Sequence, residues 1–282
     1  MTWIMISCMA LPAHGCSSPP DDQKQSPDGA DRGGSGASAA ESGRGGGGAG
    51  KAGAAAGGAA GQASGGSGAA FGKKYEGGEF HLGPVDWDET QWHNACAPST
   101  KYAPAIRELE GELLAGLWVG IPEVAGYCDA CIAVTTARGK SATLRVVTYG
   151  DTSPNSIDVS PEAFELLDSG EYPRAMSWQF AACPESGPVH YEFQTGSSQW
   201  WTSLWVRNAR LPLAKVEVQS ANHAAFAALE RGGDGTLTDG GGFGEGPFKL
   251  RLTAIDGSQH VDELAWPAGG IAGKTLKGRD NL

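Results

Sequence analysis

Short apolar runs, separated by clusters of Gly, Pro and Asn, fill the chain between about residues 80 and 184. Many of these runs contain β-branched or aromatic residues, which favour extended structure. The runs lie at residues 117–121, 130–135, 143–148 and 178–181. This pattern predicts a domain of short strands with little helix.

One helix start interrupts these strands. Ser160 is a residue type that caps helices, Pro161 would occupy the first helical position, and Glu162 would lie near the positive end of the helix dipole. The mainly apolar side chains that follow, at residues 163–167, would supply the buried face. We therefore predict a short helix that begins directly after Ser160.

The periodicity changes after Gly187, where longer strands alternate between apolar and polar positions. The predicted strands cover residues 190–194, 200–207, 214–219 and 248–254, and turns or a Gly-rich segment separate them. Antiparallel strands of this kind within about 80 residues indicate a β-sandwich. We place the boundary near residue 185, which gives one domain over residues 75–185 and a second over residues 186–282.

The N-terminal part of the chain has a different composition. Between residues 31 and 70, 29 of 40 positions are Gly or Ala. Side chains this small cannot bury enough apolar surface to offset the entropy of ordering the backbone. Residues 17–74 are therefore expected to form a disordered, Gly/Ala-rich tether, and the remaining length of about 210 residues suits two small domains.

Residues 1–16 resemble an export signal. An apolar run at residues 3–11 precedes Ala13, Gly15 and Cys16, and polar residues follow. This order is typical of a signal peptide whose cleavage leaves a cysteine for lipidation. We expect a secreted or cell-surface lipoprotein of the bacterial envelope, anchored through Cys16, with a processed signal that carries no lipid as the alternative.

Four cysteines remain in the folded part of the chain: Cys96, Cys128, Cys131 and Cys183. An even number in an exported chain predicts two disulfides, for which three connectivities are available. Cys128 and Cys131 also have the spacing of zinc ligands, but no second pair of Cys or His stands at a matching interval. We predict two disulfides, no metal and no cofactor.

Charge narrows the class of partner. From residue 73 onward the chain has 17 Lys and Arg against 27 Asp and Glu, a net charge of −10 with His neutral. Such a domain pair is repelled by nucleic acid, anionic membranes and anionic polymers, whereas a neutral polysaccharide carries no such penalty. We expect a monomer that binds a neutral polysaccharide, binds no nucleic acid, and contacts a membrane only through the lipid.

The strongest local signal is a tryptophan-rich strand at residues 196–208. Because side chains alternate between the faces of a strand, Trp201, Ser203 and Trp205 would share one face, and the apolar residues between them would pack in the core. This arrangement exposes Trp201 and Trp205, with Trp200 beside them, as a row of indoles suited to pyranose rings. The alternative is that one or two of these tryptophans fill the core or a domain interface.

Several segments of the chain resemble one family. Gly-Ser-Ser-Gln-Trp-Trp at 196–201 is followed by Val-Arg-Asn at 206–208, Lys-Val-Glu-Val at 215–218 and Gly-Pro-Phe-Lys-Leu-Arg-Leu-Thr at 246–253. This series resembles the second domain of microbial expansins, and residues 156–164 are similar to a segment of their first domain. The resemblance implies a mainly all-β chain, with a six-stranded double-psi β-barrel followed by an immunoglobulin-like carbohydrate-binding β-sandwich.

The resemblance also assigns binding aromatics. By position, Trp200 and Trp201 match the tandem aromatics with which the family binds cellulose. The family takes a third aromatic from a loop that corresponds to residues 233–237, where this chain has none. We expect Trp205 to supply the third contact.

In the barrel, the resemblance makes Asp158 the groove carboxylate. The segment that holds a second carboxylate in the family reads Val-Thr-Tyr-Gly here, at residues 147–150. Tyr149 is therefore a groove candidate, and Asp151 would replace the carboxylate only through a rearranged loop. The family's groove threonine has two candidate positions, each of which is equally expected to be an ordinary loop residue: Asp86 and Thr90.

Together these observations predict a non-catalytic protein that binds and loosens cell-wall polysaccharide, with a cellulose-like glucan favoured. One alternative is a glycoside hydrolase or lytic transglycosylase that acts through Asp158. Inverting hydrolysis needs two carboxyls roughly 6.5–9.5 Å apart, and the partner position, Val147, is apolar. Another alternative is a polysaccharide adhesin in which the barrel is a spacer. The sequence leaves open whether the polymer is cellulose, xyloglucan, chitin or peptidoglycan.

Overall fold

The structure, a computed structural model, describes residues 70–83, 85, 95–96, 108, 110–184 and 187–282. All of them belong to one compact unit of the chain. The expected signal peptide with Cys16, nearly all of the expected tether, and the groove candidates Asp86 and Thr90 lie outside the described residues. Within these ranges no helix has the length and apolar character needed to cross a membrane.

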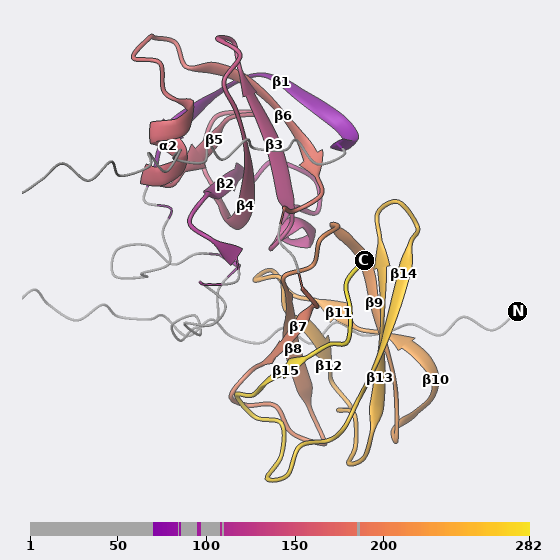
Figure 1. The fold of residues 1–282 in the computed structure, drawn as a ribbon. Coiled ribbons are helices and arrows are strands. Elements are labelled where there is room, and N and C mark those ends of the chain that lie inside the picture. The colour runs from indigo at the N-terminus through magenta and orange to yellow at the C-terminus, as the bar shows by residue number, and fades with distance from the viewer. Residues whose placement is uncertain (1–69, 84, 86–94, 97–107, 109, 185–186) are drawn as a thin grey trace, which may run out of the picture. The chain divides into compact units, whose positions relative to one another are not determined.

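The first domain is a closed barrel of six strands, and its described elements include the short α-helix α2 (Figure 1). Its elements are β1 (Ala70–Leu82), β2 (Leu114–Trp118), the 3-10 helix η1 (Val124–Tyr127), β3 (Cys131–Thr136), β4 (Ser141–Gly150), β5 (Ile157–Val159), α2 (Pro161–Leu167) and β6 (Ala175–Ala181). The strands follow the order β1-β5-β2-β4-β3-β6, with β1 parallel to β5 and β2 parallel to β4. β1 starts before the expected domain start at residue 75, because Ala70 and Phe71 already pair with β6.

Alternation along the strands fills the inside of the barrel. In β5, Ile157 and Val159 are fully buried in the core, while Asp158 between them lies on the opposite face. Tyr75 of β1 stacks on Trp178 of β6 with ring centroids 4.0 Å apart, and both residues belong to the barrel core or pack against it. This stacked pair therefore stabilises the barrel where its first and last strands meet.

The helix begins where the sequence predicts. Ser160 Oγ accepts a hydrogen bond from the Ala163 amide at 3.4 Å, as a helix cap should. The same hydroxyl donates to the Glu112 carbonyl at 2.7 Å and accepts from the Leu114 amide at 3.2 Å. Ser160 therefore caps α2 and also ties it to the start of β2.

The second domain is a β-sandwich of two antiparallel sheets (Figure 1). Its strands are β7 (His190–Phe193), β8 (Thr202–Arg207), β9 (Leu213–Ser220), β10 (His223–Ala228), β11 (Glu230–Arg231), β12 (Leu237–Asp239), β13 (Phe248–Ala254), β14 (Gln259–Leu264) and β15 (Thr275–Lys277). The sheet orders are β10-β9-β13-β14 and β11-β12-β8-β7-β15. Phe193, Phe243 and Phe248 pack in the core with ring centroids 5.2–6.4 Å apart. The predicted fold, a barrel followed by a sandwich, is confirmed.

Both expected disulfides are present, as Cys96–Cys128 and Cys131–Cys183. Cys131 opens β3 and Cys183 follows β6, so this bond links two strands that already pair. Cys96–Cys128 holds Cys96 against the turn that precedes β3. The sequence could not select between the connectivities, because the choice depends on which strands are neighbours.

Arg207, the last residue of β8, has a fully buried guanidinium that contacts both domains. Its Nε donates to Glu192 of β7 at 2.8 Å, and its Nη1 donates to Asp129 of the barrel domain at 2.5 Å. Nη1 also lies 3.3 Å from the Cys96 carbonyl, which accepts from it. Burial raises the pKa of Asp129 to about 7, and the Arg207 guanidinium opposes that rise. The guanidinium is the centre of a polar cluster that joins the barrel to the sandwich.

We expect Arg207→Ala to lower the free energy of unfolding by about 3–5 kcal/mol, because it leaves buried carboxylates without their cation. Urea unfolding of the folded part measures this loss. Arg138→Ala is the matched control: Arg138 pairs with Glu171, and the two side chains are 63 % and 52 % exposed. Pairs of that kind contribute only about 0–1 kcal/mol. Equal losses in the two variants would contradict the special role of Arg207.

Candidate polysaccharide-binding surface and groove

Trp200 lies in a tight turn that leads into β8. Its side chain is 70 % exposed, and that of the neighbouring Trp201 is half-buried. The Ser198 amide donates to the Trp201 carbonyl at 2.7 Å and closes the turn, while the Trp200 amide donates to Ser198 Oγ at 3.3 Å. An indole this exposed can meet a ligand without any rearrangement of the domain.

The loop at residues 240–244 packs against the backbone of this turn. The Gly244 amide donates to the Gln199 carbonyl at 2.9 Å, and Asn222 Nδ2 donates to the Gly242 carbonyl at 2.9 Å. Gly242 has a φ of +69°, and a Cβ at this position would lie 2.3 Å from the Gln199 carbonyl oxygen. Only glycine permits both that φ and that close approach. The backbone of the turn that carries Trp200 is therefore fixed by its contacts with the loop at residues 240–244.

The expectation that Trp205 is exposed is wrong. Its side chain is 2 % exposed, its indole N–H donates to the Asp234 carbonyl at 3.0 Å, and the Arg207 guanidinium lies over its ring at 5.2 Å. Ser203, on the same face of β8, is also fully buried and hydrogen-bonds Thr238 at 2.8 Å. Alternation separates the two faces of a strand correctly, but it does not reveal that a loop covers the outer one.

Asp158 lies in a row of paired residues that crosses four barrel strands. His81 of β1 pairs with Asp158 of β5, Asp158 pairs with Gly116 of β2, and Gly116 pairs with Thr148 of β4. Paired residues share one face of a sheet. A Cβ at Gly116 would lie 2.8 Å from Thr148 Cγ2, so glycine is required between the two polar side chains. The sequence pattern does not single out His81 or Thr148, because only the strand pairing brings them to Asp158.

The carboxyl of Asp158 is half-buried. Burial raises its pKa above the ordinary value, and the charge of His81 lowers it in opposition. Gly83 also approaches closely, since a Cβ there would lie 2.5 Å from Asp158 Cβ. A carboxyl in this environment can hydrogen-bond the hydroxyls of a ligand or act as a proton donor.

Val147 is the extra residue of a β-bulge in β4. The register with β2 shifts between the pairs Ala115–Val146 and Gly116–Thr148, which leaves Val147 unpaired in that ladder. Its side chain is fully buried, and its carbonyl accepts a hydrogen bond from the Cys96 amide at 3.3 Å. The residue that the bulge brings beside Gly116 is therefore Thr148, not a carboxylate.

The other two groove candidates near β4 differ in their surroundings. Tyr149 is half-buried, and its hydroxyl donates to the Gly233 carbonyl of the sandwich. Asp151 is exposed in the bend directly after β4. Among the described residues of the paired row, Asp158 is the one carboxylate.

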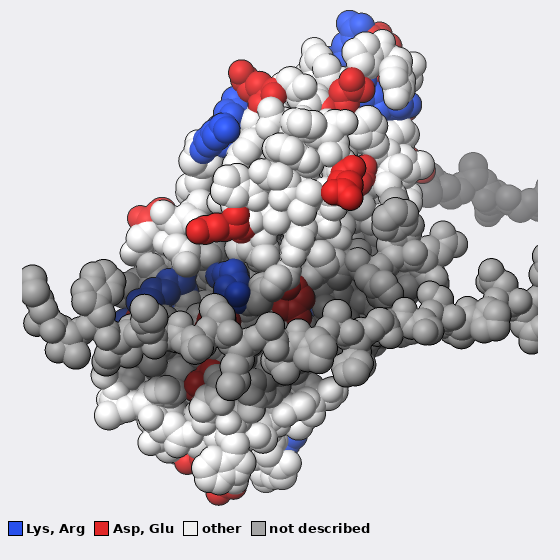
Figure 2. Space-filling view, turned by 180° about the vertical axis from the view of Figure 1, so that it is seen from behind, with Lys and Arg blue, Asp and Glu red and all other residues white. Residues whose placement is uncertain are grey.

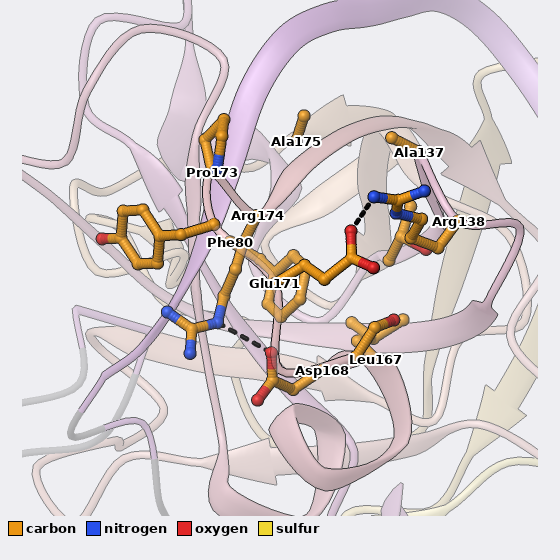
Figure 3. Close-up of a pocket in the computed structure, with 12 residues that line it drawn as sticks. Phe80, Ala137, Arg138, Leu167, Asp168, Glu171, Pro173, Arg174 and Ala175 are labelled. Carbon is orange, nitrogen blue, oxygen red and sulfur yellow. Dashed lines mark hydrogen bonds and ion pairs between the residues drawn. The ribbon is translucent and has the colours of Figure 1, made fainter.

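A separate hollow of about 300 Å³ lies between the end of α2 and the start of β6 (Figure 3). Two carboxylates line it, and both are in ion pairs: Asp168 with Arg174 at 2.9 Å, and Glu171 with Arg138. The Arg174 hydrogen bond lowers the pKa of Asp168. A general acid must carry a proton near its working pH, so this hollow is poorly suited to acid catalysis.

The visible face in Figure 2 carries charged side chains of both signs. On the face shown in Figure 2, acidic and basic side chains lie close to one another, and uncharged residues cover much of the area. On this face, the described residues form no continuous basic area for a polyanion. Within the described ranges, no three His, Cys, Asp or Glu side chains gather in a way that would hold a metal ion.

Comparison with curated proteins links the chain to expansins. No protein-family model matches it. Expansin-YoaJ of Bacillus subtilis is 25 % identical over 197 residues, which cover 68 % of this chain and 74 % of that protein. Expansin-like protein 6 of Dictyostelium discoideum is 29 % identical over 107 residues, or 36 % of this chain. Expansin-like protein 3 of the same organism is 24 % identical over 126 residues, or 42 % of this chain. The chain spans only 37 % and 38 % of these two proteins.

Solved structures give the same result for the fold. The crystal structure of the apo expansin of Clavibacter michiganensis has a TM-score of 0.58 and 21 % identity, and the match covers 74 % of this chain and 98 % of that chain. A mutant of the same expansin in complex with cellohexaose has a TM-score of 0.57 and 20 % identity, with the same coverage. The resemblance to expansins predicted from the sequence is therefore confirmed, in sequence and in fold.

Proposed function

We propose that this chain is an expansin-like protein that binds cell-wall polysaccharide, with a cellulose-like glucan favoured, and loosens it without hydrolysis. The observation that carries the proposal is the exposed Trp200, next to Trp201, on a turn that the loop at residues 240–244 fixes from behind. The complex of the Clavibacter expansin with cellohexaose supports a glucan as the ligand class.

The physical argument rests on shape and preorganisation. Indole rings match the flat apolar faces of pyranose rings and bind them with little loss of conformational freedom. The turn around Trp200 needs no ordering on binding, because hydrogen bonds from Gly244 and within the turn already hold its backbone. The net charge of −11 disfavours anionic polymers and leaves neutral glucans unaffected.

In the barrel we assign Asp158 to groove binding. Together with His81 and Thr148 it forms a polar row whose side chains can hydrogen-bond sugar hydroxyls. Loosening would then come from competition between these groups and polymer–polymer contacts. We further propose that the protein is exported and that Cys16 carries a lipid, although Cys16 lies outside the described residues.

A second candidate function is cleavage of a glycan, by hydrolysis or lytic transglycosylation. One observation favours it: burial raises the pKa of Asp158, as a general acid requires. Against it, the position expected for a second carboxylate is the buried Val147, and the nearby Asp151 is exposed after the strand. One carboxyl cannot both protonate the leaving oxygen and activate water on the opposite face of the sugar.

For binding, we expect Trp200→Ala combined with Trp201→Ala to weaken adsorption to insoluble cellulose by about tenfold or more, as loss of two central aromatic contacts should. A depletion assay against cellulose, xyloglucan, chitin and peptidoglycan measures affinity and polymer preference together. Tyr172→Ala is the matched control, because Tyr172 is a 74 % exposed aromatic on the barrel domain. Unchanged adsorption by the double variant would exclude this surface.

For catalysis, we expect no release of soluble reducing sugar from amorphous cellulose, mixed-linkage glucan or peptidoglycan. Asp158→Asn should impair wall loosening, measured as creep of a loaded cellulose-rich sheet, because it removes a hydrogen-bond acceptor from the groove. Turnover that disappears in Asp158→Asn would instead make Asp158 a general acid and favour the second candidate function.

The raised pKa of Asp158 also predicts a pH dependence of stability. The folded protein holds the Asp158 proton more tightly than the unfolded chain, so this group reduces stability as the pH rises from the unfolded to the folded pKa. Asp158→Asn removes the group that titrates, and with it this loss of folding stability at higher pH. Urea midpoints of the variant relative to wild type should therefore be higher at about pH 7 than at about pH 3. A relative midpoint that falls with rising pH would contradict the burial of this carboxyl.

A further inference from the structure

A hollow of about 580 Å³ opens beside Trp200. Its lining includes the turn at residues 197–200 and the segment at residues 266–272, with Trp266 at its start. Glu245 completes the lining. Two tryptophans that are far apart in the sequence thus border one open space, which has the size of an ordinary small-ligand site.

We propose that Trp266 is a further sugar-contacting residue, and that the hollow between it and Trp200 is a subsite for one unit of a neutral glycan. This inference rests on the proposed function and specifies where the bound chain extends. It replaces the buried Trp205, which has no surface to offer as an additional aromatic contact.

The indole of Trp266 is anchored on one side and half-buried overall. Its ring meets that of the buried Phe248 at 6.3 Å and 77°, an edge-to-face contact that leaves the remainder of the indole for the hollow. The segment behind it is fixed as well, because Ile271 is buried and its carbonyl accepts from the Lys274 amide at 3.1 Å. The wall therefore has a defined shape before any ligand binds.

Polar groups in the hollow are available to a ligand. Among the described residues, the side chains of Gln199 and Glu245 make no hydrogen bond or ion pair, and both line the hollow. The Gln199 amide can donate hydrogen bonds to ring hydroxyls and accept them, and the Glu245 carboxylate can accept them. The Glu245 carboxylate repels an acidic sugar, so the ligand class is a neutral, hydroxyl-rich glycan and not a uronic-acid polymer.

The experiment measures binding of cellohexaose and cellotriose to the full folded part by isothermal titration calorimetry. We expect Trp266→Ala to weaken cellohexaose binding by about five- to tenfold, the size of one aromatic contact, with a smaller effect on the shorter cellotriose. Glu245→Ala, an exposed substitution that leaves the core intact, should weaken cellohexaose severalfold. Val261→Ala, at a 42 % exposed position of β14 outside the hollow, should change nothing.

The outcomes separate this inference from the proposed function. If wild-type protein and the Trp200→Ala, Trp201→Ala double variant behave as the proposed function requires, but Trp266→Ala and Glu245→Ala bind cellohexaose like wild type, the subsite is excluded and the function stands. If wild-type protein binds neither cellohexaose nor chitohexaose nor xylohexaose, both are excluded. Should Trp266→Ala fail to fold, Trp266→Phe keeps the packing on Phe248, and its retained affinity together with the loss in Glu245→Ala supports the subsite.

Discussion

The burial of one guanidinium, that of Arg207, constrains much of the surrounding structure. Removing a cation from water is costly unless anionic and polar partners replace its hydration. Here those partners come from two domains: Glu192 lies on the adjacent strand, and Asp129 and the Cys96 carbonyl belong to the barrel domain. A cluster with these requirements is satisfied by few arrangements, so it specifies how the end of β8 meets the barrel domain.

The burial of Arg207 also explains why Trp205 is buried while Trp200 is exposed. Trp205 lies two residues before Arg207 on the same face of β8, and the arrangement that satisfies the guanidinium covers that indole as well. Trp200 precedes β8 and lies outside the covered part of the strand, so it remains exposed. Trp205 is held within the sandwich through its hydrogen bond to the Asp234 carbonyl, and Trp200 remains exposed.

Much of the fold follows from local signals in the sequence. Residues 248–254 form β13 with the predicted bounds, since apolar and polar residues alternate there without interruption. Ser160 caps α2 as predicted, because capping depends on residues adjacent in the chain. What the sequence could not supply depends on distant contacts: the cover over Trp205, the bulge at Val147 and the pairing of the cysteines. Trp266 belongs to no sequence pattern, since it is a single tryptophan after a strand, and only the fold brings it to the same hollow as Trp200.

The disulfide between Cys96 and Cys128 gives the two domains different sensitivities to redox conditions. Cys96 supplies a carbonyl to Arg207, and Cys128 directly precedes Asp129, so one covalent bond holds both barrel groups that receive the guanidinium. Residues 187–282 contain no cysteine, and the turn that carries Trp200 depends only on hydrogen bonds and packing. A reductant would therefore weaken the barrel domain and its contact with Arg207. The turn that carries Trp200 would keep its hydrogen bonds. Protein made in a reducing cytosol would lack this covalent support for the contact between the barrel and the sandwich.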